Sequence, residues 1–120
     1  MYFEFETQQR QGATWAPMID VCERPTEIVI FVEMPGVDRS DVQLSWSEGM
    51  LIISGVKRPP DRAVATYLCV ERSYGQFRRE ISINIPIDQK HAKAELKDGL
   101  MKIRLPKLAS KSEACNIPIL

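Results

Sequence analysis

Apolar and polar residues alternate most regularly between residues 92 and 107, where two short runs flank the pair Asp98-Gly99. An Asp-Gly pair tolerates the positive φ angles of a two-residue type I′ turn, so this segment is predicted to form a β-hairpin. The opposite pairs on its apolar face are Leu96 with Met101, Ala94 with Ile103 and Ala92 with Leu105. Two strands bury too little surface to be stable alone, so the rest of the chain must supply an opposing layer.

A second hairpin is predicted for residues 42–56, whose alternating runs flank Glu48-Gly49. Pairing Ser47 with Met50 again collects the apolar residues on a single face. The opposite pairs on that face are Trp46 with Leu51, Leu44 with Ile53 and Val42 with Gly55. The segment 28–32 is apolar at every position, which indicates a strand that is covered on both faces.

The longest extended segment is predicted between residues 67 and 86, with strict alternation from Phe77 onward. Arg79 falls in the apolar row of this alternation, where an unpaired guanidinium would be costly to bury. We therefore expect Arg79 to have a partner. The preceding loop, residues 57–66, contains Pro59-Pro60 and is longer than a tight hairpin needs, so a role beyond connection is expected.

No stretch of more than a few residues has helical periodicity, and the short runs and turns predict about eight strands in an antiparallel β-sandwich. Residues 15–107 would form this domain, with a short arm at 1–14 and a tail at 108–120. The arm carries Tyr2, Phe3 and Phe5 without a clean period. These aromatic residues would either pack on the edge of the domain or form a contact surface for other chains.

Composition narrows the function. Hydrophobic residues make up 44% and charged residues 27% of the 120-residue chain, which is typical of one folded domain. Sixteen basic residues balance sixteen acidic ones, so no nucleic-acid or membrane-surface partner is expected. No apolar run is long enough to span a membrane, and residues 1–11 lack a signal-peptide pattern, so the expected location is the cytoplasm.

The sequence offers no set of residues for catalysis, a cofactor or a metal. Cys22, Cys69 and Cys115 lie far apart and form no CxxC pair, which favours free thiols, buried or half-buried, over a zinc site or disulfide framework. His91 is the only histidine and lies in a polar linker, and there is no nucleophile motif or Gly-rich phosphate loop. We therefore expect that the protein is not an enzyme.

Several short motifs, taken in order, resemble those of the small heat shock proteins, the Hsp20 or α-crystallin domain family. The likeness covers roughly residues 15–120. The matching residues are Pro17 with Asp20-Val21, Met34-Pro35-Gly36-Val37, Leu51-Ile53-Gly55, Glu71-Arg72, Tyr74-Gly75 with Phe77 and Arg79, Ala94-Leu96, Gly99-Leu100, Ile103, Leu105-Pro106-Lys107 and Ile117-Pro118-Ile119. Each motif is weak alone, but their order and spacing are highly specific.

This resemblance implies an immunoglobulin-like β-sandwich, dimers, larger homo-oligomers and ATP-independent capture of unfolding proteins. Arg79 matches an arginine near the family's dimer interface, and the loop 57–66 matches the position of a strand that swaps between subunits in many members. The residues expected at the dimer interface are Arg79, Glu71, Arg72, Val64 and Tyr67. The aromatic residues Tyr2, Phe3 and Phe5 of the arm would contact client proteins.

The same resemblance implies that the tail residues Ile117, Pro118 and Ile119 dock into a groove of a neighbouring subunit. Residues two apart in an extended tail point the same way, so the two isoleucines can enter adjacent pockets. The groove would lie between the edge strands and would be lined by Val42, Leu44, Trp46, Ala94 and Leu96, where it could bind the tail or a client. The tail could instead be a terminal strand packed on its own domain.

These observations predict a holdase chaperone that binds partly unfolded proteins and prevents their aggregation. The alternative is a co-chaperone or adaptor that resembles the p23 or CS-domain class and binds one folded partner. The tail motif favours the first function, whereas a monomer in solution would favour the second. A small hydrolase on a β-sandwich is disfavoured, because the catalytic residues are missing.

Overall fold

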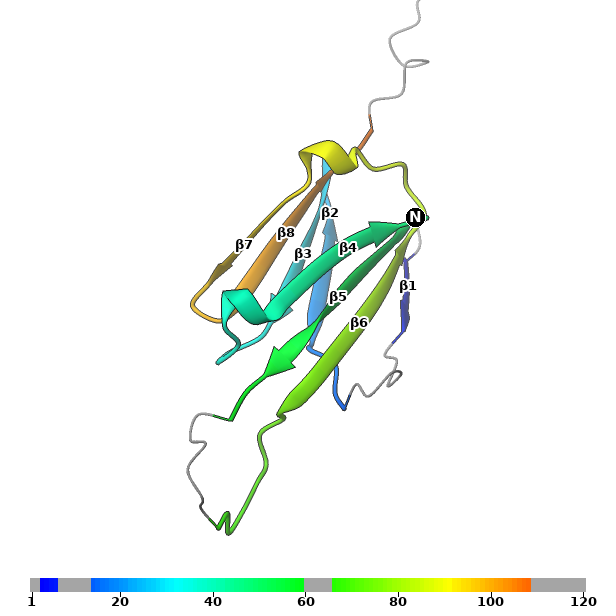
Figure 1. Ribbon diagram of the computed structural model, residues 1–120. Coiled ribbons are helices and arrows are strands. Elements are labelled where there is room, and N and C mark those ends of the chain that lie inside the picture. Colours follow the sequence, from blue (N-terminus) through cyan, green and yellow to red (C-terminus); the bar gives the residue numbers. More distant parts are fainter. Residues whose placement is uncertain (1–2, 7–13, 60–65, 109–120) are drawn as a thin grey trace, which may run out of the picture.

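The computed structural model describes residues 3–6, 14–59 and 66–108. Its strands form two four-stranded antiparallel sheets that pack face to face as a β-sandwich (Figure 1). Within the described residues, the only helical elements are the single 3-10 turns η1 (Arg39–Asp41) and η2 (Gln89–His91). The prediction of an all-β, immunoglobulin-like antiparallel sandwich is therefore confirmed.

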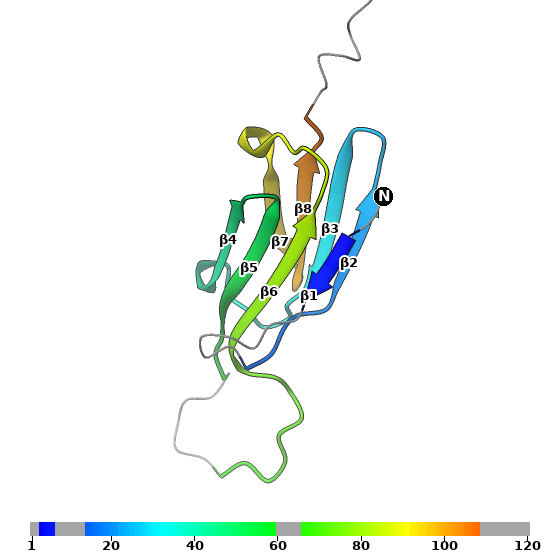
Figure 2. The same ribbon diagram turned by 90° about the vertical axis from the view of Figure 1, so that its right-hand side faces the viewer.

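The first sheet has the order β1-β6-β5-β4 and the second has the order β2-β3-β8-β7. The strands of the first sheet are β1 (Phe3–Glu6), β4 (Val42–Ser47), β5 (Met50–Lys57) and β6 (Gly75–Ile83). Those of the second are β2 (Ile19–Glu23), β3 (Glu27–Glu33), β7 (Lys93–Lys97) and β8 (Leu100–Pro106). The edge strands β4 and β7 lie on one side of the sandwich, and β1 and β2 lie on the other (Figure 2).

Both predicted hairpins are present with the predicted register. The turn residues have the positive φ angles that a type I′ turn requires: 53° at Asp98 and 77° at Gly99, and 50° at Glu48 and 78° at Gly49. Leu96 pairs with Met101 in one hairpin, and Trp46 pairs with Leu51 in the other. The β7–β8 ladder ends at Lys93, so the expected pairing of Ala92 with Leu105 is not formed.

The core lies between the sheets and is built from the inward positions of the central strands. Strand β3 runs between β2 and β8, and its Ile28, Ile30 and Val32 are fully buried in the core. Val29 points to the other face of the sheet and is also fully buried, but Phe31 on that face is only half-buried, so the prediction that this strand is covered on both faces is confirmed at Val29 and not at Phe31. The partner strands supply Leu51, Ile53, Phe77, Ile81, Ile83, Met101, Ile103 and Leu105.

Gly55 allows β4 to start close to the core. A Cβ atom at this position would lie 2.1 Å from the carbonyl oxygen of Asp41 and 2.7 Å from Cζ of Phe77. These distances are too short for any side chain, so glycine is required where β5 pairs with the first residue of β4, Val42.

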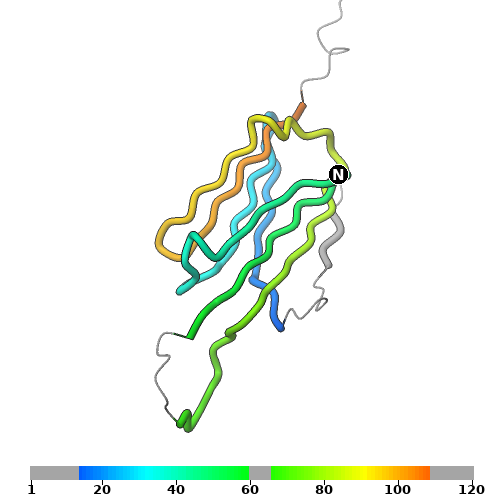
Figure 3. Tube along the Cα trace, in the orientation of Figure 1, coloured from blue at the N-terminus to red at the C-terminus, as the bar shows by residue number. Residues whose placement is uncertain are grey.

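Two expectations about extended segments are wrong in detail. Residues 3–6 of the expected arm form a strand that pairs with β6, with Phe3 opposite Ile83 and Phe5 opposite Ile81. Conversely, residues 67–74 of the expected long strand form none, and β6 begins only at Gly75. The last pair of the β5–β6 ladder is Lys57 with Gly75, so residues 67–74 have no neighbouring strand among the described residues to hydrogen-bond with. These residues extend past the ends of the strands (Figure 3).

Candidate docking groove between the edge strands

Strands β4 and β7 form the walls of the candidate site. Within the described residues, each is the last strand of its sheet and has a hydrogen-bonded neighbour on one side only. Along β4, Val42, Leu44 and Trp46 are half-buried and alternate with exposed residues, as the period of two predicts. Along β7, Leu96 is half-buried and its neighbours are exposed. The edge strands therefore present partly accessible apolar side chains.

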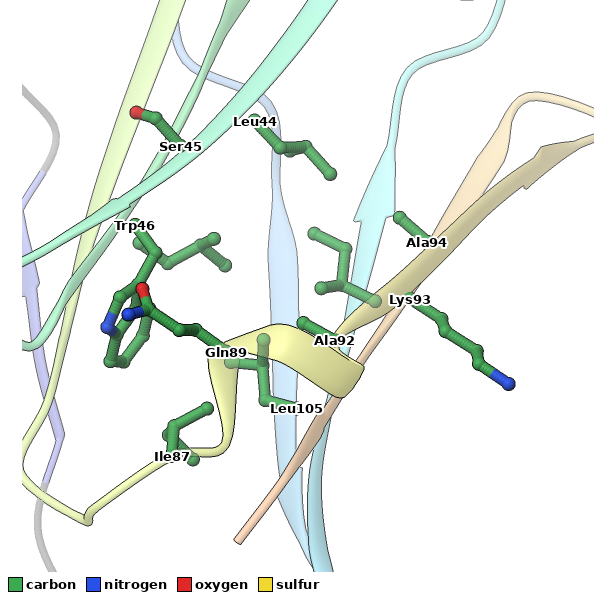
Figure 4. A pocket seen from close by; sticks show the side chains of 11 residues that line it. Leu44, Ser45, Trp46, Ile87, Gln89, Ala92, Lys93, Ala94 and Leu105 are labelled. Carbon is green, nitrogen blue, oxygen red and sulfur yellow. The ribbon is translucent and has the colours of Figure 1, made fainter. Parts of the chain in front are cut away.

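A groove with a volume of about 190 Å³ lies between these strands (Figure 4). Its base is made of the buried core residues Leu51, Ile103 and Leu105. The residues that line its walls and ends are Leu44, Ser45, Trp46, Ile87, Gln89, Ala92, Lys93 and Ala94. Apolar side chains dominate this surface, and it contains no acidic residue, so it suits apolar side chains of an incoming extended segment.

The turn of η2 brings three further residues to the groove. Ile87, Gln89 and Ala92 line it, and the Gln89 side chain lies on the same side of the turn as the Trp46 ring (Figure 4). The turn is held at both ends, because the backbone N–H of Asp88 donates to the carbonyl of Pro106 at 2.9 Å and that of Ala92 donates to Gln89 at 3.3 Å. Nδ1 of His91 lies 2.7 Å from Oδ2 of Asp88 on the exposed side.

The structure brings together three of the five residues predicted to line the groove. Leu44, Trp46 and Ala94 line it, and Ala94 is exposed. Val42 and Leu96 do not line it but pack against the core. Val42 is the first residue of β4 and Leu96 is the last but one of β7, so both lie toward the strand ends opposite to those that line the groove.

The predicted groove set lacks eight residues that line the groove: Ser45, Leu51, Ile87, Gln89, Ala92, Lys93, Ile103 and Leu105. Most of these lie in the predicted hairpins, but Ile87 and Gln89 precede them, in a polar linker whose residues have no strand period. A signal was nevertheless present, since Ile87 is an isolated large apolar residue within a polar stretch. An apolar residue in that setting often marks a contact with the core, and Ile87 does pack against the core.

The loop between β5 and β6 holds most of the described residues that were predicted for a dimer interface. Tyr67, Glu71 and Arg72 line one recess on this loop, together with Pro59, Cys69, Val70 and Tyr74. The loop also exposes apolar side chains: Leu68 is 96% exposed, Val70 is 61% exposed and Tyr67 is 55% exposed. Val64 lies outside the described residues.

Arg79 lies apart from that loop recess. It is a half-buried residue of β6, pairs with Ile53 of β5, and lines another recess together with Asp20 and Glu33. The other residues of this recess are Met18, Ile19, Phe31 and Leu100. This recess therefore places two acidic residues on the same surface as a guanidinium that the alternation of β6 directs toward the interior of the sandwich.

Other chemistry is sparse in the part of the chain that the structure describes. It contains no group of three or more His, Cys, Asp or Glu residues that could hold a metal ion. It also contains no helix that could cross a bilayer. Cys22 and Cys69 are free thiols as expected, but both are exposed, so the expectation that they would be buried or half-buried is wrong. Cys22 is on an edge strand and Cys69 is on the loop, where neither sheet covers them.

Comparison with known proteins decides the family. The model of the "Hsp20/alpha crystallin family" matches residues 20–120, most of the chain. The chain belongs to this family. It is 34% identical over 105 residues to "Small heat shock protein C4" of Rickettsia felis, in an alignment that covers 87% of this chain and 64% of the Rickettsia protein. The chain thus spans somewhat less than two thirds of that relative.

Solved structures of small heat shock proteins have the same fold. Heat shock protein 16.0 from Schizosaccharomyces pombe superposes with a TM-score of 0.76 at 33% identity, over 89% of this chain and all of that one. A small heat shock protein from Xylella fastidiosa, whose structure is described as "a distinct high order structure", gives a TM-score of 0.74 at 27% identity, over 90% of this chain and 95% of that one.

Membership of the Hsp20/alpha crystallin family confirms the resemblance found in the sequence. The sandwich is an α-crystallin domain. Small heat shock proteins are ATP-independent chaperones rather than enzymes, which agrees with the lack of a catalytic set in the sequence. Oligomeric assembly is likewise a property of the family.

Some predicted site residues fall outside the described part of this Hsp20 chain. They are Tyr2 of the arm and the tail residues Ile117, Pro118 and Ile119. Phe3 and Phe5 are placed only by the backbone pairing of β1. Their roles in client contact and tail docking stay predictions.

Proposed function

We propose that this protein is an ATP-independent holdase that binds partly unfolded proteins and assembles through dimers into larger homo-oligomers. The observation that carries the proposal is the apolar groove between β4 and β7, found on a domain of the Hsp20 family. Apolar side chains of an unfolding protein or of a second subunit would be removed from water in this groove. Their burial would stabilise the complex by roughly 25 cal/mol per Å² of apolar surface.

The groove would receive the tail of a neighbouring subunit. Ile117 and Ile119 would enter it beside Leu44, Trp46 and Ala94, with Pro118 stiffening the backbone between them. Two buried isoleucines give about 3–6 kcal/mol before the cost of ordering the tail, so a single contact is weak and many together are strong. In this organisation residues 15–107 are the domain, 1–14 an arm whose strand β1 pairs with β6 of that domain, and 108–120 the tail.

The loop between β5 and β6 would form the dimer contact. Its exposed Tyr67 and Leu68 support this role, because apolar side chains this accessible are a liability unless a partner covers them. Glu71, Arg72, Val64 and Arg79 would complete the interface, and Tyr2, Phe3 and Phe5 would contact clients. The proposed location is the cytoplasm, and no nucleic acid, membrane, metal or cofactor enters the proposed activity.

The decisive experiment is light scattering of a heated, aggregation-prone client protein with and without the chaperone, in the absence of ATP. Suppression near one subunit per client, unchanged when ATP is added, is the expected result. A folded protein that leaves client aggregation unchanged at every ratio would overturn the holdase proposal. If that protein were also a monomer, the adaptor function would take its place.

A further inference from the structure

Lys57 is a buried lysine at the last position of β5, where the long loop begins. Its side chain is only 6% exposed, which is unusual because a lysine ammonium is strongly hydrated and carries three N–H donors. Nζ lies 5.9 Å from the centroid of the Trp15 ring and 5.6 Å from that of the Tyr74 ring. These cation–π contacts stabilise the charge but give its N–H groups no hydrogen-bond acceptor.

A second cation points to the same place. The guanidinium of Arg72 lies over the Tyr74 ring, which Lys57 also contacts, with Cζ 5.3 Å from the ring centroid. A Cβ atom at Gly36 would lie 3.3 Å from Cε of Lys57, 3.8 Å from Nη2 of Arg72 and 3.9 Å from Nζ of Lys57. The Lys57 side chain therefore lies directly against the Gly36 turn, and the two positive groups meet there.

No acidic side chain of the described residues neutralises this pair. Neither Lys57 nor Arg72 has a carboxylate within 4 Å among them. Other basic residues of the same part of the chain do have one, namely Arg24, Arg58, Arg78, Arg104 and Lys107. The electrostatic consequence is visible at Lys57: burial lowers its pKa, and the positive charge of Arg72 lowers it further.

We propose that Lys57 and Arg72 form a binding site for a carboxylate at the Gly36 turn. A carboxylate would accept charge-assisted hydrogen bonds from the Lys57 ammonium and the Arg72 guanidinium, and would cancel the repulsion between them. The carboxylate would sit where the two positive groups meet at the exposed Gly36 turn, with the Trp15 and Tyr74 rings beside the Lys57 ammonium. Arg72 is exposed, so the carboxylate reaches the site from the side of the loop.

The site is held at the base of the loop by contacts that do not involve the two cations. Nε1 of Trp15 donates to the carbonyl of Gly75 at 3.2 Å, and the backbone N–H of Thr14 donates to the carbonyl of Gln76 at 2.8 Å. Trp15 also packs on Phe77 with a ring centroid distance of 5.0 Å. The aromatic walls therefore stay in place when a cation is substituted, which makes the site testable by mutation.

The carboxylate has two possible sources: a free carboxylate ion, or an aspartate or glutamate side chain of a second copy of this chain. The test uses the full chain and three variants: Lys57→Met, which keeps the aliphatic stem, Arg72→Gln, and the control Arg58→Gln. Arg58 is the residue next to Lys57, but its guanidinium is exposed and bonded to Asp41 at 3.0 and 3.1 Å. The control thus makes the same change in net charge outside the site.

The first arm measures the unfolding midpoint in sodium citrate and sodium chloride at equal ionic strength. A free carboxylate at ten times its Kd raises the midpoint by about 4–8 °C in the parent and in Arg58→Gln, and the rise is lost in Lys57→Met and Arg72→Gln. The second arm measures the dimer dissociation constant. If the carboxylate comes from a side chain of a second copy, the dimer dissociation constant should rise about tenfold or more in Lys57→Met and Arg72→Gln but not in Arg58→Gln.

Either of these results supports the site and identifies its source. If both site variants match Arg58→Gln in citrate and in dimer strength, Lys57 is only a packing residue held by its two aromatic neighbours, and the proposal is wrong. Should Lys57→Met fold poorly, the citrate arm with Arg72→Gln still decides, because Arg72 is exposed. Arg72 also belongs to the dimer contact proposed above, so a weaker dimer counts for the site only when Lys57→Met shows it as well. The citrate result needs no client-aggregation assay and is independent of the holdase proposal.

Discussion

The groove between β4 and β7 and the loop between β5 and β6 both offer apolar side chains to a partner, but they do so in different ways. In the groove, Leu44 and Trp46 are half-buried residues of the regular strand β4. They lie on the face of this strand that packs against the core. On the loop, Leu68 is 96% exposed in a segment without strand neighbours. The groove is a gap left by two sheets, whereas the loop carries its side chains away from both.

This difference sets how each surface responds to mutation. Groove residues pack in the sandwich and would also contact a bound partner. A large substitution there therefore lowers both the stability of the fold and the affinity for the partner, and the two effects are hard to separate. Exposed loop residues contribute little to the isolated fold, so their substitution reports on the partner alone. The exception in the groove is Ala94, which lines it but is exposed.

The largest effect is expected on the loop. Replacing Leu68 and Val70 with glutamate should raise the dimer dissociation constant about 100-fold or more, because charges would be buried at the contact. The unfolding midpoint of the monomer should not fall, because both side chains are exposed. Analytical ultracentrifugation measures the dimer dissociation constant.

Leu108→Glu is the control, because Leu108 is 56% exposed and follows β8, away from the loop. If the loop variants and this control form dimers of equal strength, the loop is not part of the interface.

The groove should respond more moderately. Ala94→Glu places a carboxylate on an apolar wall and should reduce larger assemblies to dimers, with no loss of the dimer itself. Replacing Ile117 and Ile119 with alanine should give the same mass, because it removes the other half of the same contact. Light scattering measures both.

The matched control for the groove is Lys97→Gln, which makes the same change in net charge on the same strand but outside the groove. It should retain the larger assemblies. A tail variant with unchanged mass would mean that the tail does not dock, and an Ala94→Glu variant with unchanged mass would move the docking site elsewhere.

Arg79 belongs to neither region, so it tests whether the dimer contact extends beyond the loop. Arg79→Ala leaves Asp20 and Glu33 in a recess without its positive charge, and should cost about 1–2 kcal/mol of stability or dimer strength. Thermal unfolding at two protein concentrations separates the two effects. An unaltered midpoint and dimer constant would exclude Arg79 from both roles.

The smallest effect concerns pH at the base of the loop. Burial and Arg72 lower the pKa of Lys57 from 10.5, so the unfolded chain holds this proton more tightly than the folded one. Stability from this group is therefore highest above pH 10.5 and is lost as the pH falls through the lowered pKa. Lys57→Met should flatten this slope in urea unfolding on the alkaline side. An unchanged slope would show that the buried ammonium is already neutralised.

The sequence alone determined the features that depend on neighbouring residues. The two-residue turns at Glu48-Gly49 and Asp98-Gly99 set the register of both hairpins, because their φ angles and the period of two leave one pairing that keeps the apolar face together. Continuous apolar character in β3 likewise predicted a strand covered on both faces. The groove residues were predicted from the family resemblance, and three of those five line the groove.

Only the tertiary structure decided which segments meet across the sandwich. Ile87, Gln89 and Ala92 reach the groove because η2 folds against the end of β8, a contact for which the sequence gives only the isolated apolar residue Ile87 as a signal. Residues 67–74 remain outside the sheets because β5 ends before it can pair with them, and Lys57 meets Arg72 at Gly36 through three distant segments. Turn geometry and side-chain alternation act over a few residues, whereas the distance between sheets is set by the packing of the whole core.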